Sequence, residues 1–271
     1  MSWARIMVPL AGAQGDASAL AAAAAIAAPF DAEVAAVYTP ADIADVMPWM
    51  GEGFLGGVQT TALESLREAT AAGEAAARKT VAEAGYARTA FVSLETPVWA
   101  GLSVEGRLSD VLVFGPDAAR GRGPLAESFQ QIVADEQRPT VVARAGLQVG
   151  GVVAVAWDGG KEASRAARTA LPLLQKSSKV VVLSAPQATS RKFDPQRLAD
   201  FLAAREVRAE VQVLEGSGDA AGLLIGACER LGAGILVAGA FGHPRLQEFI
   251  FGGTTRTLLG AEDGPSLFLS H

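Results

Sequence analysis

The chain has 271 residues, a formal net charge of −6 and a sequence pI near 5.1. Half of its residues are hydrophobic and 19% are charged, a composition that excludes an intrinsically disordered chain. The acidic balance argues against a nucleic-acid binder, which needs a basic surface. One cysteine cannot close an intramolecular disulfide, and two histidines cannot build a multi-histidine metal site. The longest apolar run, Ala19–Ala28, is too short to span a membrane, so we expect a cytoplasmic protein without a membrane partner.

The two halves of the sequence share one pattern of apolar runs, glycines and prolines. Such an internal repeat is a stronger guide to the fold than any single motif. Corresponding positions are Gly115 with Gly239, Pro139 with Pro265, and Ile6–Gly12 with Val153–Gly159. The repeat predicts two domains, residues 1–146 and 150–271, each within the usual size range of a domain.

The first half opens with an apolar run at Ile6–Leu10, and its next distinctive segment is Met47–Gly57, rich in methionine, tryptophan and glycine. We expect this segment to form a mobile loop over or beside the carboxyl edge of the sheet. Within it, Gly51–Gly56 matches the G-x-G-x-x-G dinucleotide fingerprint, but no strand precedes the match, so a loop is the favoured interpretation. A helical pattern follows over Thr60–Ala84, and another helix is expected to begin near Ala126.

The second half alternates strand-length apolar runs with helical patterns. Its strands are expected near Val152–Trp157, Val180–Ala185, Ala209–Leu214, Ile235–Gly239 and Ser266–Leu269. Most of these runs are continuously apolar, which is typical of parallel strands covered on both faces. Both halves are therefore predicted to be doubly wound α/β domains, which bind ligands beyond the carboxyl ends of their strands.

Two parts of the second half carry groups suited to a ligand. Asp158 follows the first strand, where its carboxylate can accept a hydrogen bond from a ribose hydroxyl or cap the helix that begins near Lys161. A loop runs from the strand end at Gly239 to a helix start near Gly253, whose free amides suit a phosphate. Thr254 or Thr255 can add a hydroxyl, and Arg245 or Arg256 a countercharge. The alternative is that these glycines serve only strand exit and helix packing.

The spacing Gly239-x2-Gly242-x9-Gly252 resembles the G-x2-G-x9-G-[Ser/Thr] signature of the universal stress protein family, and the resemblance covers essentially the whole chain as a tandem-domain member. It implies two Rossmann-like sheets of five parallel strands, of the adenine nucleotide alpha hydrolase-like type, related by a pseudo-twofold axis. It also implies that ATP, with Mg, is held in the second half. The residues that the resemblance assigns to the nucleotide are Asp158, Ala185, Gly239, Gly242, Gly252, Gly253 and Thr254.

The two halves depart from this family pattern to different degrees. In the second half Gly253 stands where the signature has Ser or Thr, and the first hydroxyl comes at Thr254. In the first half Ala11 stands in the place of the aspartate, and the glycine spacing after Gly115 is lost. Glu127 there places a carboxylate where a phosphate would sit. The first half is therefore expected to be degenerate and to bind no nucleotide.

Three functions are compatible with these patterns. The first is stress response by regulation, with adenine nucleotide bound in the second half. The second is a dimerising scaffold of the same fold without nucleotide, and the third is a slow ATPase or nucleotidyl transferase. The enzyme alternative has little support, because His243 and His271 lack a Ser/Asp arrangement and Cys228 lies on an apolar helical face.

The last strand of each half, Thr140–Ala143 or Ser266–Leu269, is short and apolar and carries no lysine or internal proline. An unguarded apolar strand at a sheet edge promotes aggregation unless something covers it. In the resembling family this strand pairs across a dimer. We therefore expect the two strands to pair antiparallel inside this chain, giving one pseudo-twofold particle, and leave pairing with a second copy of the chain open.

Overall fold

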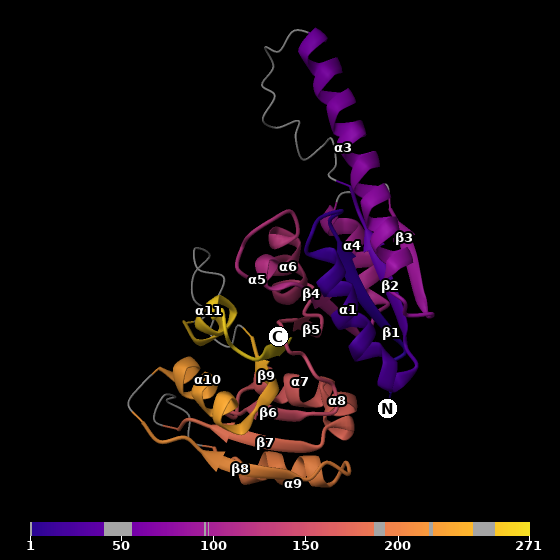
Figure 1. Cartoon of the computed structure of the whole chain (residues 1–271). Coiled ribbons are helices and arrows are strands. Elements are labelled where there is room, and N and C mark those ends of the chain that lie inside the picture. Colours follow the sequence, from indigo (N-terminus) through magenta and orange to yellow (C-terminus); the bar gives the residue numbers. More distant parts are fainter. Residues whose placement is uncertain are drawn as a thin grey trace.

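The computed structural model describes residues 2–40, 56–94, 96, 98–186, 193–216, 219–240 and 253–271, with the backbone alone for 56–63. The strands of these residues form one ten-stranded sheet in the order β3-β2-β1-β4-β5-β10-β9-β6-β7-β8 (Figure 1). Counted outward from the centre, each half contributes its fifth, fourth, first, second and third strand. The predicted fold class, two consecutive doubly wound sheets of five strands, is confirmed.

The first half is built on parallel pairings throughout. Its strands are β1 (Arg5–Leu10), β2 (Glu33–Tyr38), β3 (Thr89–Ser93), β4 (Val111–Phe114) and β5 (Thr140–Val142). Its helices are α1 (Asp16–Ala27), the 3₁₀ helix η1 (Ala28–Phe30), α3 (Gly56–Glu83), α4 (Val98–Arg107), α5 (Pro116–Ala119) and α6 (Ala126–Ala134). The start of α6 at Ala126 is the predicted one.

The long helix α3 begins earlier than the sequence pattern predicts. It starts at Gly56 rather than Thr60, so the last two residues of the glycine-rich segment are helical. Two adjacent glycines are poor helix formers, and no apolar periodicity marks this turn, which explains the missed start. Its N-terminal end extends away from the sheet (Figure 1). Residues 47–55 of the segment lie outside the described residues, so the expected mobile loop stays a prediction.

The second half repeats the arrangement, again with parallel pairings. Its strands are β6 (Val152–Ala156), β7 (Lys179–Ser184), β8 (Ala209–Val213), β9 (Ala233–Gly239) and β10 (Ser266–Ser270). Its helices are α7 (Lys161–Thr169), α8 (Leu171–Lys176), α9 (Gln196–Ala203), α10 (Ala220–Leu231) and α11 (Gly253–Gly260). All five strands lie where their apolar runs predict.

The two halves join through their last strands, as the sequence predicts. β5 and β10 pair antiparallel, with Val142 opposite Leu267, Val141 opposite Phe268 and Thr140 opposite Leu269. Both strands are fully buried. The two apolar edges therefore cover each other, and the sheet continues from one half into the other.

Side chains alternate between the two faces of the sheet, so each face carries its own hydrophobic layer. One layer is covered by α1, α3, α7, α8 and α9, and the other by α4, α5, α6, α10 and α11. Each layer contains residues from both halves. Trp3, near the N-terminus, stacks on Phe268 of β10 with ring centroids 6.0 Å apart. Among the described residues no helix has both the length and the apolarity to cross a membrane.

Candidate functional site

The fold brings three predicted site residues of the second half to one edge of the sheet. β6 lies between β7 and β9, and the chain winds in opposite directions on its two sides, which makes this a topological switch point. Asp158 follows β6, Ala185 follows β7, and Gly239 ends β9. Ligands of doubly wound sheets bind at such a switch point, beyond the carboxyl ends of the strands.

Asp158 shapes the turn that leads into α7. Its Oδ1 accepts a hydrogen bond from the main-chain N–H of Gly160, at 2.8 Å, and Gly160 is the residue before the first turn of the helix. A carboxylate that binds the amide two residues later forms an Asx turn. This bond goes to the residue before the helix and not to an amide of its first turn, so Asp158 shapes the turn without capping α7. The Asp158 side chain is exposed at the edge of the sheet, which also leaves it within reach of a ligand.

Gly159 completes this turn and lies under an aromatic ring. Its φ of +74° lies in the left-handed region, which glycine adopts without strain. A Cβ at Gly159 would overlap the ring of Phe193, a residue that is about half exposed. The sequence pattern gave no sign of this contact, because Phe193 is far along the chain and outside any recognised motif.

Gly239 is explained by packing. A Cβ at this position would lie 2.5 Å from the main-chain nitrogen of Ala163 and 2.6 Å from the carbonyl carbon of Glu162, both in the first turn of α7. The missing side chain therefore lets α7 approach β9. The structure therefore gives a direct reason for the second alternative, in which this glycine serves helix packing.

The start of α11 presents exposed main chain at the same edge. Gly253 and Thr254 are both exposed, whereas Thr255 is buried. The hydroxyl of Thr257 donates to the Gly253 carbonyl at 3.0 Å, which closes the first turn. The other predicted loop positions, Gly242 and Gly252, and the loop histidine, His243, lie outside the described residues.

The opposite end of α11 is held by arginines of the first half, which the sequence pattern did not reveal. Arg144, just after β5, donates to the carbonyls of Pro265 at 2.5 Å and Leu258 at 2.6 Å. Arg120 donates to the carbonyl of Ala261 at 3.0 Å. Cations and N–H donors at a helix C-terminus satisfy its free carbonyls and complement its dipole. Burial, together with the nearby Arg120, lowers the pKa of Arg144 to about 10, so its side chain stays protonated at neutral pH.

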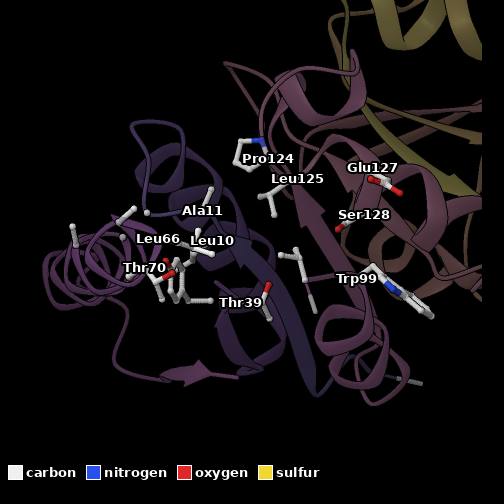
Figure 2. A pocket seen from close by; sticks show the side chains of 16 residues that line it. Leu10, Ala11, Thr39, Leu66, Thr70, Trp99, Pro124, Leu125, Glu127 and Ser128 are labelled. Carbon is white, nitrogen blue, oxygen red and sulfur yellow. Dashed lines mark hydrogen bonds between the residues drawn. The ribbon is translucent and has the colours of Figure 1, made fainter. Parts of the chain in front are cut away.

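The corresponding place in the first half is a cavity of about 680 Å³, a size typical of small-molecule sites (Figure 2). Its walls come from the ends of β1 and β2, the inner face of α3, the start of α4 and the start of α6. Ala11, Thr39 and Glu127 line it, and they are the counterparts of Asp158, Ala185 and the start of α11.

Two other residues with reactive groups, Cys228 and His271, are held within the packing of the fold. Cys228 is buried on α10, and burial raises the pKa of its thiol to about 12, as expected for a cysteine that acts as a small hydrophobe. Nδ1 of His271 lies 3.0 Å from the Ala240 carbonyl. In the described part of the chain no cluster of three or more His, Cys, Asp or Glu residues could hold a metal ion.

The sheet defines a tandem doubly wound α/β protein, and comparison with solved structures specifies the fold further. A universal stress protein from Archaeoglobus fulgidus DSM 4304 is similar over 98% of this chain and 95% of its own, with a TM-score of 0.70 and 12% identity. A functionally unknown protein from Pseudomonas aeruginosa PAO1 is similar over 99% of this chain and 92% of its own, with a TM-score of 0.57 and 14% identity. No family model and no curated protein sequence matches the chain. The chain has the universal stress protein fold in both halves, as the glycine signature predicts.

Proposed function

We propose that the second half binds an adenine nucleotide, ATP with Mg, and that the protein acts by regulation in the stress response of the cytoplasm. The observation that carries the proposal is that Asp158 after β6 and Ala185 after β7 lie at the carboxyl edge of the sheet, beside the switch point between β6 and β9. The universal stress protein fold supports the stress-response role. We further propose residues 1–146 and 150–271 as the two structural units.

The chemistry of this edge suits a nucleotide. The exposed amides at the start of α11, with the positive end of its dipole, favour phosphate oxygens, and Thr254 adds an exposed hydroxyl beside them. The Asp158 carboxylate can accept from a ribose hydroxyl. Magnesium in such sites is bound largely by the phosphates themselves. Gly242 and Gly252 complete the predicted phosphate loop.

Calorimetry of the whole chain with Mg-ATP tests this proposal. We expect at most one nucleotide per chain, because the first half lacks both the glycine spacing and the aspartate. Gly242→Val should weaken binding sharply, since a side chain would take space that the ligand needs. The matched control is Gly115→Val, because a Cβ at Gly115 meets no atom within 4 Å. Two equivalent sites, or unchanged affinity in Gly242→Val, would contradict the proposal.

A scaffold without nucleotide is the second candidate, and two observations favour it. Gly239 is accounted for by its contact with α7, and β5 and β10 already pair into one continuous sheet. If the intact chain shows no heat with Mg-ATP and no nucleotide accompanies it in native mass spectrometry, the scaffold is the better account. Conversion of ATP to product during incubation would instead favour the enzyme.

A further inference from the structure

The two halves place opposite chemistry at the same position of the fold. In the second half the first-strand residue is Asp158 and the helix that follows the last loop begins with Gly253 and Thr254. In the first half the counterparts are Ala11 and the pair Ala126 and Glu127. The second half thus has its carboxylate at the strand end, whereas the first half has one at the start of the helix, where the second half has free amides.

A second carboxylate, at the first residue of α1, binds the loop between β1 and α1. Asp16 is buried and accepts hydrogen bonds from the main-chain N–H groups of Ala11 at 3.0 Å, Gly12 at 2.8 Å and Ala13 at 3.2 Å. These amides are therefore unavailable to a phosphate. Burial raises the pKa of Tyr38, which lines the cavity, and the charges of Glu74 and Asp16 raise it further. Both carboxylates have partners of their own, since Glu74 pairs with Arg78 and Asp16 accepts from the loop amides.

The residues that line the cavity carry negative charge. Among the described residues that line the cavity, Glu127 carries a charge and none is lysine or arginine. Glu127 stands in the first turn of α6, where its carboxylate complements the helix dipole that would otherwise attract an anion. A phosphate placed here would meet a like charge instead of a cation.

The rest of the wall is suited to an apolar body. Apolar side chains dominate it: Leu10, Ala11, Leu66, Ala69, Ala72, Val98, Trp99, Pro124 and Leu125. Figure 2 shows Trp99 and Glu127 on the same side of the cavity, with Ser128 between them in this view. Trp99 is 50% exposed, and the face of a tryptophan ring attracts an organic cation.

Thr39 belongs to the polar part of the cavity wall. Its side chain lines the cavity and is 5% exposed, yet Oγ1 has no hydrogen-bond partner in the described part of the chain. Because Oγ1 is itself buried, it lies behind the wall and does not contact a molecule in the cavity. The neighbouring Tyr38 hydroxyl, by contrast, donates to the Thr70 carbonyl at 3.1 Å.

We propose that the first-half cavity binds an organic cation, a protonated amine or quaternary ammonium carried on an apolar body. The head group lies against the Glu127 carboxylate and the Trp99 indole. The body lies among the apolar side chains contributed by β1, α3 and the loop before α6. This site is separate from the nucleotide site of the second half.

Three probes with one apolar body and different head groups test the proposal: 3-phenylpropylammonium, 3-phenylpropanol and 3-phenylpropanoate. Calorimetry of the whole chain should give an affinity for the ammonium at least about tenfold above that for the carboxylate, with the alcohol between them. Glu127→Gln should weaken ammonium binding about threefold to fivefold and leave alcohol binding unchanged. The control is Glu229→Gln, an exposed glutamate on α10 that should alter nothing.

A cavity-filling variant, Ala11→Phe, tests the location of the site even if the head-group effect is small. It should abolish binding of the ammonium and the alcohol together while the chain stays folded by circular dichroism. Equal affinity for carboxylate and ammonium, binding of the ammonium that survives Ala11→Phe, or no ammonium binding at millimolar concentration would each overturn the proposal. Failure here leaves the Mg-ATP titration unaffected, because that titration concerns the other half.

Discussion

At Gly239 the main chain of β9 lies directly against the first turn of α7, and the absence of a side chain sets how close helix and sheet come. Its counterpart in the first half, Gly115, faces open space at the start of α5. The same residue type at equivalent positions thus has a packing reason in one half and none in the other. Sequence alone does not distinguish the two, because the neighbour that decides the matter is on another element.

Alanine substitution at these two glycines therefore has unequal effects. We expect Gly239→Ala to lower the free energy of unfolding by about 1–3 kcal/mol, because the added Cβ overlaps backbone atoms that cannot rotate away. Gly115→Ala should change it by less than about 0.5 kcal/mol, since φ is −73° and nothing is in contact. Urea unfolding of the two variants measures the difference, and equal effects would contradict the contact with α7.

Glu136 and Arg107 form a pair whose contribution depends on pH. Arg107 Nε donates to Glu136 Oε2 at 2.8 Å, and Nη2 donates to Oε1. These hydrogen bonds, against the opposing effect of burial, lower the pKa of Glu136 below its ordinary value of 4.5. A lowered folded-state pKa stabilises the fold above the unfolded pKa, and this contribution is lost as the pH falls through the folded value.

Glu136→Gln should therefore reduce stability at pH 7, and the difference from the original protein should shrink as the pH falls below about 4.5. Thermal unfolding at a series of pH values gives this profile. Glu210→Gln, at the exposed pair with Lys179 on the sheet edge, is the control and should change stability little at any pH. A deficit in Glu136→Gln that stays constant with pH would show that the charge is irrelevant.

Among the elements, those with a continuous or periodic apolar pattern could be predicted and those fixed by long-range contacts could not. The starts of α7 at Lys161 and α11 at Gly253 follow from the strand ends and loops that precede them. The early start of α3 could not be predicted, because Gly56 and Gly57 disfavour a helix locally. The role of Arg144 was also hidden, because its partners on α11 are in the other half.

The arginine contacts with the end of α11 predict a stability effect that crosses the halves. Arg144→Met keeps most of the side-chain volume but leaves the buried carbonyl of Leu258 and the partly buried carbonyl of Pro265 without their donor. We expect a loss of about 2–4 kcal/mol in the free energy of unfolding. Arg122→Met, which breaks the exposed pair with Asp117, should cost less than about 1 kcal/mol. Equal costs in chemical denaturation would show that the α11 contacts do not matter.

At the scale of the whole molecule the two halves behave as one sheet with shared layers. β5 has β4 on one side and β10 on the other, so it is a central strand although each half alone would leave it at an edge. Both hydrophobic layers run across this junction. The sequence predicts the pairing, because two short apolar strands without guarding residues need cover, but it gives neither the register nor the stacking of Trp3 on Phe268.

Proline at Val142 should consequently destabilise both halves together. It removes an N–H from a strand with neighbours on both sides, and we expect a loss of at least about 2 kcal/mol. Val213→Pro on the edge strand β8 is the control. The N–H of Leu214 donates to Ser184, so the N–H of Val213 points to the open edge. Amide hydrogen exchange should speed up in β6 and β9 for Val142→Pro alone, and unchanged exchange there would mean that the halves unfold independently.

The account rests most heavily on the nucleotide site at the switch point of the second half. A crystal structure of the chain with Mg-ATP tests it most directly. The account predicts one nucleotide per chain, with phosphates at the amides of Gly253 and Thr254, ribose at Asp158 and adenine beside Ala185. An empty second half, or a nucleotide whose phosphates lie against Glu127 in the first-half cavity, would contradict it.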